Sequence, residues 1–410
     1  MKKLKLILFV NLLICQSISL LFGFTYPDIC GIPDFLLSGY QRGLGDIANG
    51  FGARSLSMGS TGITSSDEPS TLLLNPAGLS TLDLKMLSFG FGLANVTERV
   101  DTISQDIPFY NFQNYFHFNN IAITYPLSNI HFGFGFFPVS NFQYKHKKYY
   151  YSNGKATGFK KIISEGIVYS VTPAISFKTN FIAVGFVYNS YLGDTAFEIK
   201  DVIYATKFIP EISTKTVLGS NFSGGQISVG SIIFIKQNAR LGFVFKPSFN
   251  INNKYETIGS TIATTGKIKY NYPFEIDIGL AYFFDNKSKN KVLIDFLIKK
   301  LASFEVGGEK ISEFRNFSEL HVGVEHGISQ NFLLRYGFYY QPYYAAKEFE
   351  KVFITAGCGF NLSTILSIDV AGEYGKRDYR FIDSEEKFWD VDQRIDESIK
   401  RIVVQGKIKW

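Results

Sequence analysis

The last ten residues, Arg401-Ile402-Val403-Val404-Gln405-Gly406-Lys407-Ile408-Lys409-Trp410, decide the fold. Apolar residues or glycine stand at every second position from Ile402 to Trp410, and the positions between them are polar except for Val403. This alternation is typical of a β-strand with one apolar face and one polar face. The sequence therefore predicts an amphipathic strand that ends on an aromatic residue.

The same alternation recurs through the last two-thirds of the chain, where short polar turns separate the segments. We expect about fourteen strands, an even number, as single-chain bacterial outer-membrane barrels have. They are placed at 84–95, 117–126, 129–144, 159–176, 179–199, 222–236, 239–255, 262–284, 289–301, 316–327, 330–341, 350–361, 364–374 and 399–410.

A soluble β-sandwich also alternates, but two features favour a transmembrane antiparallel β-barrel. The polar faces repeatedly carry charges and glycine, as a hydrated lumen does, and the apolar faces are aromatic at their ends. Aromatic residues make up 16% of the chain and charged residues 19%, less charge than the usual quarter or so of a soluble protein. We expect long external loops at 145–158, 200–221 and 375–398.

The N-terminus has the pattern of a signal peptide. Lys2, Lys3 and Lys5 precede an apolar core from Leu6 to Leu21, so we expect residues 1–23 to be removed on export. Lipoprotein processing at Cys15 and a retained membrane anchor remain alternatives. Beyond residue 24 no apolar run reaches the roughly 20 residues of a membrane helix, so a membrane-spanning chain would have to form a closed barrel.

The segment 24–82 does not alternate, and it is rich in glycine and small polar residues. We expect it to form an N-terminal hatch, or plug, in the lumen of a barrel that comprises residues 83–410. The name hatch is used below for residues 24–82.

Two motifs in the hatch carry a family resemblance: Gly52-Ala53-Arg54-Ser55-Leu56-Ser57-Met58-Gly59 and Asn75-Pro76-Ala77-Gly78-Leu79. They resemble the N-terminal signature of the FadL-like outer-membrane β-barrel superfamily. Within it, the PorV/PorQ-like or UPF0164 branch is the most similar. The segment that contains both motifs, 52–79, is about thirty residues long, and the rest of the chain resembles the superfamily only in its strand pattern.

The resemblance implies a fourteen-stranded barrel in the bacterial outer membrane with a hatch inside it. It also implies passive uptake of hydrophobic molecules, such as long-chain fatty acids, that leave the lumen sideways at a kink in the third strand. The alternative is a PorV-like binding or shuttle component of a protein secretion or surface-attachment system. A structural barrel without cargo is a third possibility.

The third strand contains residues that weaken strand pairing. Gly133 and Gly135 lower the stability of a strand, and Pro138 cannot donate a ladder hydrogen bond. A gap for lateral exit is one interpretation of Pro138. The other is that Pro138 merely ends the embedded part of the strand.

Further candidate site residues lie in the hatch and in the lumen. We expect Arg54 to pair with a lumen carboxylate such as Glu325, Asp369 or Glu373, and Arg335 to be a further lumen charge. Lumen cations could meet the head group of a cargo or simply offset neighbouring carboxylates. The candidate hatch or ligand residues are Arg54, Met58, Gly59, Asn75, Pro76, Ala77 and Gly78, and Trp410 is the candidate assembly signal.

Other classes of function find little support in the sequence. There is no block of five Lys or Arg residues for nucleic acid, and there is neither a G-x-S-x-G nor an H-E-x-x-H motif. Gly43-Leu44-Gly45-Asp46-Ile47-Ala48 matches a dinucleotide turn by letters, but no strand precedes it. We expect no enzyme activity, cofactor or metal. The expected partners are outer-membrane lipid, a hydrophobic ligand and the barrel-assembly machinery during biogenesis. The PorV-like alternative adds a secretion-system protein.

Overall fold

The computed structural model describes most of the chain beyond residue 45. The described residues are 46–47, 50–65, 67–102, 105–152, 155–205, 210–236, 238–259, 263–284, 290–311, 314–342, 344, 350–381 and 393–410. The predicted signal peptide and the first part of the hatch, 24–45, lie outside them. Within these ranges, no helix has the length and apolar character that a membrane span requires.

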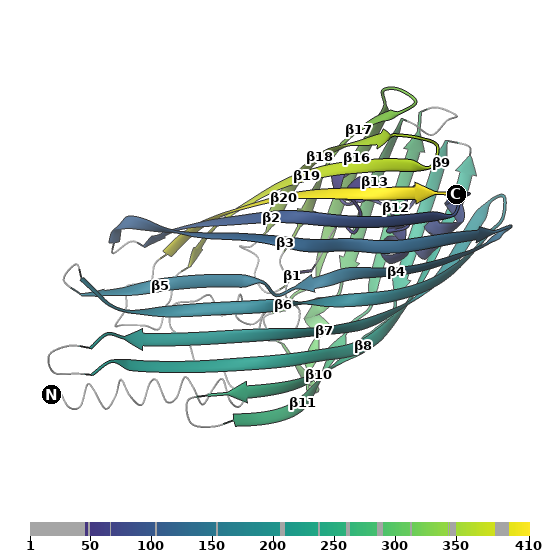
Figure 1. The fold of residues 1–410 in the computed structure, drawn as a ribbon. Coiled ribbons are helices and arrows are strands. Elements are labelled where there is room, and N and C mark those ends of the chain that lie inside the picture. The colour runs from purple at the N-terminus through teal and green to yellow at the C-terminus, as the bar shows by residue number, and fades with distance from the viewer. Residues whose placement is uncertain are drawn as a thin grey trace.

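The strands form one closed antiparallel barrel (Figure 1). Its segments are β2 (Met86–Thr102), β3 (Gln105–Leu127), β4 (Ile130–Asn141), β5 (Tyr144–Ser152), β6 (Lys155–Lys178), β7 (Ile182–Ile203), β8 (Ile212–Lys236), β9 (Ala239–Lys246), β10 (Phe249–Ile258), β11 (Ala263–Tyr272), β12 (Glu275–Phe283), β13 (Lys291–Lys299), β16 (Phe317–Gly327), β17 (Phe332–Gln341), β18 (Lys351–Asn361), β19 (Leu366–Phe381) and β20 (Gln393–Lys409). The barrel closes where β2 pairs with β20, from Met86 opposite Lys409 to Thr102 opposite Gln393.

Three barrel strands are each broken into two segments, so these segments make fourteen strands, as the alternation predicted. β4 and β5 form one strand, β9 and β10 a second, and β11 and β12 a third. Pro247 separates β9 from β10 and Pro273 separates β11 from β12. A proline has no N–H for the ladder, which explains both breaks.

The apolar faces point outward and the polar faces point into the lumen. On β20, Ile402 and Val404 are 56% and 47% exposed, whereas Gln405 and Lys407 are 0% and 5% exposed. Side chains on a strand alternate between its two faces. The outer surface is therefore apolar, as contact with lipid requires.

The two sides of the barrel differ in length (Figure 1). The short wall, β13 and β16–β18, has strands of 9, 11, 10 and 11 residues, which is about the length that spans a membrane. The long wall, β3–β8, includes strands of 23, 24, 22 and 25 residues in β3, β6, β7 and β8. These strands continue far beyond a membrane.

The lengths of the strands correct the expected loops. Most of 145–158 belongs to β5 and β6, most of 200–221 to β7 and β8, and much of 375–398 to β19 and β20. Outside a membrane both faces of a strand can be polar, so the alternation fades although the backbone pairing continues. The sequence pattern consequently understates the strand lengths.

The described part of the hatch lies inside the barrel (Figure 1). It contains β1 (Asp46–Ile47), α3 (Ala53–Ser57), α4 (Thr71–Leu74) and the 3-10 helix η1 (Pro76–Thr81). α3 contacts β17–β20, and η1 contacts β4 and β6–β8. The hatch thus touches both the short wall and the long wall.

Candidate functional site

Asn75 joins the hatch to the long wall. Its side-chain amide donates to the carbonyl oxygens of Ile63, at 2.7 Å, and of Ser231 on β8, at 3.2 Å. Its Oδ1 accepts from the backbone N–H of Ala77 at 3.0 Å and so caps η1. Pro76 follows at the first helical position, where its missing N–H is not needed.

Glycines in the long wall make room for this motif. A Cβ atom on Gly185 of β7 would collide with the backbone of Pro76 and Ala77, and one on Gly230 of β8 would collide with the side chain of Asn75. Backbone can approach this closely only where the wall carries no side chain. The Asn-Pro-Ala-Gly element is therefore seated against two strands.

The Met58-Gly59 turn is seated against the short wall. Gly59 has φ +65°, in the left-handed region that favours glycine. Its N–H donates to Oγ1 of Thr355 on β18 at 2.9 Å, and its carbonyl oxygen lies 2.7 Å from Nδ1 of His321 on β16. A Cβ atom on Gly323 of β16 would collide with Met58.

A buried ion-pair network joins the hatch to the short wall. Arg54 lies 3.2 Å from Glu325 on β16 and 3.1 Å from Asp67 of the hatch. Lys291 on β13 lies 2.6 Å from Asp67 and 3.0 Å from Glu325. Arg54, Lys291 and Glu325 are nearly inaccessible to solvent, so each charge depends on its partners.

The network continues along the wall. Arg335 on β17 lies 2.6 Å from both Glu325 and Asp369, and Lys407 on β20 also contacts Asp369. Among the lumen carboxylates expected to pair with Arg54, the structure places Glu325 beside it, while Asp369 pairs with Arg335 and Lys407. Sequence reasoning missed Lys291 and gave Asp67 no role, although Asp67 and Glu68 lie between the two motifs.

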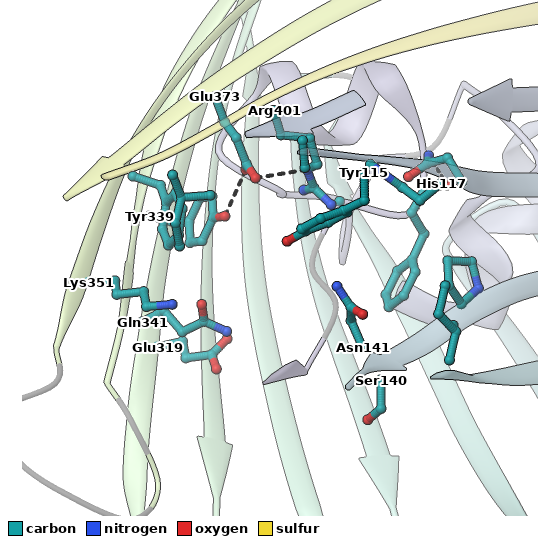
Figure 2. A pocket seen from close by; sticks show the side chains of 18 of the residues that line it. Tyr115, His117, Ser140, Asn141, Glu319, Tyr339, Gln341, Lys351, Glu373 and Arg401 are labelled. Carbon is teal, nitrogen blue, oxygen red and sulfur yellow. Dashed lines mark hydrogen bonds and ion pairs between the residues drawn. The ribbon is translucent and has the colours of Figure 1, made fainter. Parts of the chain in front are cut away.

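Glu373 belongs to a separate group farther along the lumen (Figure 2). Its carboxylate accepts from the hydroxyl of Tyr339 at 2.8 Å and lies 2.8 Å from Nε of Arg401. The Tyr339 ring stacks on Phe353, with 4.6 Å between the ring centroids. These side chains line a cavity of about 140 Å³.

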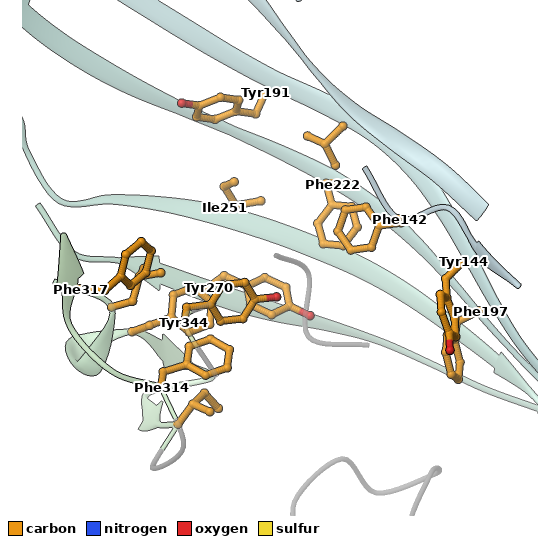
Figure 3. Close-up of a cluster of buried hydrophobic side chains, with 14 of the residues drawn as sticks. Phe142, Tyr144, Tyr191, Phe197, Phe222, Ile251, Tyr270, Phe314, Phe317 and Tyr344 are labelled. Carbon is orange, nitrogen blue, oxygen red and sulfur yellow. The ribbon is translucent and has the colours of Figure 1, made fainter. Parts of the chain in front are cut away.

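A second cavity, of about 150 Å³, adjoins the first at Phe51 and Ser140. A cavity of about 150 Å³ can hold one small ring such as benzene. Packed aromatic rings lie close by, and Phe222 lines the second cavity while Phe317 and Tyr344 line the first (Figure 3). The rings of this aromatic cluster include Phe142, Tyr144, Tyr191, Phe197, Phe222, Tyr270, Phe304, Phe314, Phe317 and Tyr344.

The ladder between β3 and β4 stops part of the way along the wall. It runs from Leu127 opposite Ile130 to Ile121 opposite Phe136. β4 remains paired with β6 as far as Asn141, with a shift of register between Pro138 and Ser140. Among the described residues, no ladder joins β3 to β4 beyond Phe136, and this stretch is called the gap.

The candidate glycines of the third strand lie just below the gap. Gly133 and Gly135 are still paired with Thr124 and Ala122 of β3. A Cβ atom on either would meet Leu72 of the hatch. These glycines therefore admit the hatch, and the loss of pairing comes after them, next to Pro138.

The N-terminal end of the described hatch bridges the gap from inside. β1 pairs antiparallel with Ser140 and Asn141 of β4. The carbonyl oxygen of Phe51 accepts from the side-chain amides of Asn119 and Asn120 on β3, at 3.2 and 2.8 Å. Two consecutive residues reach it because β3 has an irregular register there.

Comparisons with solved structures show which known proteins share this fold. A Pseudomonas aeruginosa FadL homologue matches with a TM-score of 0.63 and 12% identity over 89% of this chain and 99% of its own. The Pseudomonas putida toluene transporter TodX gives 0.61 and 16% over 89% and 99%. The Ralstonia pickettii toluene transporter TbuX gives 0.60 and 17% over 88% and 99%. The protein is a membrane-type β-barrel that resembles the FadL transporters of Gram-negative outer membranes.

Comparisons of sequence give the family. No curated protein matches the chain. The finer assignment to a PorV/PorQ-like or UPF0164 branch stays a prediction. The family model described as BamG matches residues 37–378, which is most of the sequence, and the chain belongs to the BamG family.

Proposed function

We propose that the protein carries small hydrophobic molecules through the outer membrane, from the lumen cavities sideways through the gap. One observation carries the proposal: both edges of the gap line the first cavity. Tyr115, His117 and Asn119 come from β3, and Pro138 and Ser140 come from β4. A ligand in that cavity would lie directly beside the unpaired stretch of wall.

The hatch, in this proposal, remains seated while cargo passes. Wall glycines and the buried ion pairs of Arg54 hold it on both sides of the barrel. Withdrawing it would leave Glu325 and Lys291 with fewer partners in a buried site, which is costly. A sideways route needs only the short stretch at β1 and Phe51 to move.

We further propose that the cargo is uncharged. Lys246 pairs with Glu275 and Asp277 at 3.2 and 2.9 Å. Lys299 pairs with Glu319 at 2.8 Å. These cations, like Arg335 and Arg401, already have carboxylate partners, so a cargo carboxylate would compete with them. The toluene transporters TodX and TbuX, which share this fold, are named for such a neutral molecule.

The test is to narrow the gap. Ser140→Trp would place an indole at the edge of β4, and Ser190→Trp, on β7 of the same wall, is the control. In a strain that lacks the protein, we expect Ser140→Trp to abolish uptake of labelled toluene while Ser190→Trp restores it. Heat-dependent gel mobility would show that both variants form barrels. Unchanged uptake with Ser140→Trp would contradict the proposed exit route.

A second candidate function is a role beside the barrel-assembly machinery, which the BamG family match favours. The long wall would offer the surface for such a partner. Mild crosslinking in outer membranes, followed by purification, tests it. Capture of assembly-machinery subunits at stoichiometric yield supports it, whereas capture of a secretion component without bound lipid supports the PorV-like alternative.

A further inference from the structure

Four lysines lie side by side across the long wall. Lys147 of β5 is opposite Lys161 of β6, Lys161 is opposite Lys200 of β7, and Lys200 is opposite Lys215 of β8. Neighbouring strands are about 4.8 Å apart, so the row is roughly 15 Å long. We call these four residues the lysine row.

The lysine row faces outward. Lys160 and Ile162, on either side of Lys161, are buried, as is Ile199 beside Lys200. Because side chains alternate between the two faces of a strand, Lys161 and Lys200 must point away from the lumen. The exposed positions of Lys147 and Lys215 agree with this.

The protein itself balances little of this charge. Like charges directly opposite one another on a sheet are destabilising. Glu198 pairs with Lys215 at 2.9 Å, and the nearby Glu165 pairs with Lys145 instead, at 3.1 Å. No ion pair of Lys147, Lys161 or Lys200 with a carboxylate is found among the described residues. The row is thus a concentrated positive site that lacks a matching set of protein anions.

The row also has a definite height above the membrane. The exposed apolar side chains of β7 run from Phe186 to Leu192, and Lys200 lies eight residues farther along. At about 3.3 Å per residue and a tilt of about 45°, that is roughly 20 Å beyond the last exposed large apolar side chain of β7. The longest connections between barrel strands, which join β7 to β8, β13 to β16, β17 to β18 and β19 to β20, lie at this end. The hatch lies at the opposite end, so this end faces outside.

Aromatic rings stand next to the row. The ammonium of Lys147 lies 4.5 Å from the ring centroid of Tyr149 and 4.3 Å from that of Phe159. Such cation–π contacts hold the ammonium in place without neutralising it. Rings beside cations also offer apolar surface on which a sugar can pack.

We propose that the lysine row binds the phosphate groups of lipopolysaccharide saccharides in the outer leaflet. Lysine binds phosphate as a point charge and needs no fixed fork geometry. The height of the row matches a headgroup layer, and its length allows it to contact more than one phosphate. The proposal does not depend on the cargo or on the proposed transport route.

The site also adjoins the gap. The carbonyl oxygen of Lys145, two residues before Lys147, accepts from the side-chain amide of Gln113 on β3 at 3.1 Å, and the N–H of Lys145 donates to Oε1 of Gln113 at 3.1 Å. This side-chain bridge between β3 and β5 limits the gap at the end nearer the lysine row. Bound lipopolysaccharide would therefore hold the strand that forms the upper edge of the gap.

Titration of the purified, detergent-solubilised full-length protein with lipopolysaccharide tests the proposal. The variant is Lys147→Gln/Lys161→Gln/Lys200→Gln. The control, Lys254→Gln/Lys267→Gln/Lys269→Gln, removes the same charge from exposed positions on β10 and β11. We expect the row variant to bind roughly 100-fold more weakly at low salt and the control to bind within about twofold of the wild type.

Two further probes separate the sources of phosphate. Dephosphorylated lipopolysaccharide should bind as weakly as the row variant binds the intact molecule, and millimolar inorganic phosphate should fail to compete. Equal loss in the control variant, equal binding of the dephosphorylated form or full competition by inorganic phosphate would each overturn the proposal. Gel mobility with and without heating checks that both variants are folded.

Discussion

The short wall and the long wall hold the same hatch by different means. On the short wall, β16 and β17 supply Glu325 and Arg335 to a buried network with Arg54. On the long wall, β7 and β8 receive η1 through backbone fit at Gly185 and Gly230. Close fit against wall glycines holds the hatch on both walls, and buried ion pairs add to it where the barrel is short.

The short wall holds the hatch by buried ion pairs, and the long wall contains the proposed exit route. The gap belongs to the long wall, and so do the two strand edges that line the first cavity there. The lysine row lies on the same wall. The buried ion pairs lie on the opposite side, so movement at the gap need not disturb them. The predictions below test this division, beginning with the largest effect.

Arg335→Ala should destabilise the protein most. It leaves the buried carboxylates of Glu325 and Asp369 each with one fewer partner, and breaking a buried ion pair typically costs about 3–5 kcal/mol. Urea unfolding in lipid bilayers would measure the loss. Lys215→Ala, an exposed lysine on the long wall, is the control and should change stability by about 0.5 kcal/mol or less. A similar loss in both variants would remove the distinction between the walls.

Gly230→Val should act on the long wall by overpacking. The new side chain would collide with Asn75, and forcing extra methyl groups into a packed site costs about 1–3 kcal/mol. Gly219→Val, on the same strand, has only the carbonyl oxygen of Glu256 nearby, at 3.8 Å. Protease cleavage of the hatch should increase in the first variant and stay at the wild-type rate in the second. Equal cleavage in both would mean that shape does not hold η1.

Asn75→Ser should have a smaller effect, because the serine hydroxyl can still cap η1. It loses the amide donations to Ile63 and Ser231, each worth about 1 kcal/mol net. Asn75→Ala loses the cap as well, which costs about a further 1 kcal/mol. Unfolding measurements on both variants should therefore rank wild type above Ser, and Ser above Ala. The reverse order of Ser and Ala would show that the cap is unimportant.

Moderate acid should have the smallest effect. Burial by itself would raise the pKa of the Asp67 carboxyl, but the charges of Arg54 and Lys291 outweigh it and hold that pKa well below the usual range. A carboxyl with a depressed folded pKa contributes fully above its unfolded pKa, roughly 3.9, and loses the contribution only as pH falls further. Protease protection of the hatch should thus be equal at pH 8 and pH 5. Marked loss by pH 5 that is absent in Asp67→Asn would contradict this.

Much of the candidate site was predictable in kind but not in detail. The hatch motifs singled out Arg54, Asn75 and Gly59, because capping residues, turn glycines and a lone arginine are visible in a sequence. Lys291 was not visible as a partner of the hatch, since it lies on a barrel strand more than two hundred residues from Arg54. The bridging of the gap by Phe51 depends on a local irregularity of β3 that no pattern revealed.

The sequence by itself determined the membrane-type barrel, its number of strands and the face that each side chain takes, because alternation is a property of residues two apart. Only the tertiary structure decided how far the long wall extends, where the β3–β4 ladder ends and which charges meet. Those features depend on register between strands that are distant in sequence, and register is set by pairing across the sheet. The lysine row is the clearest case: four scattered lysines become one site only when β5–β8 align.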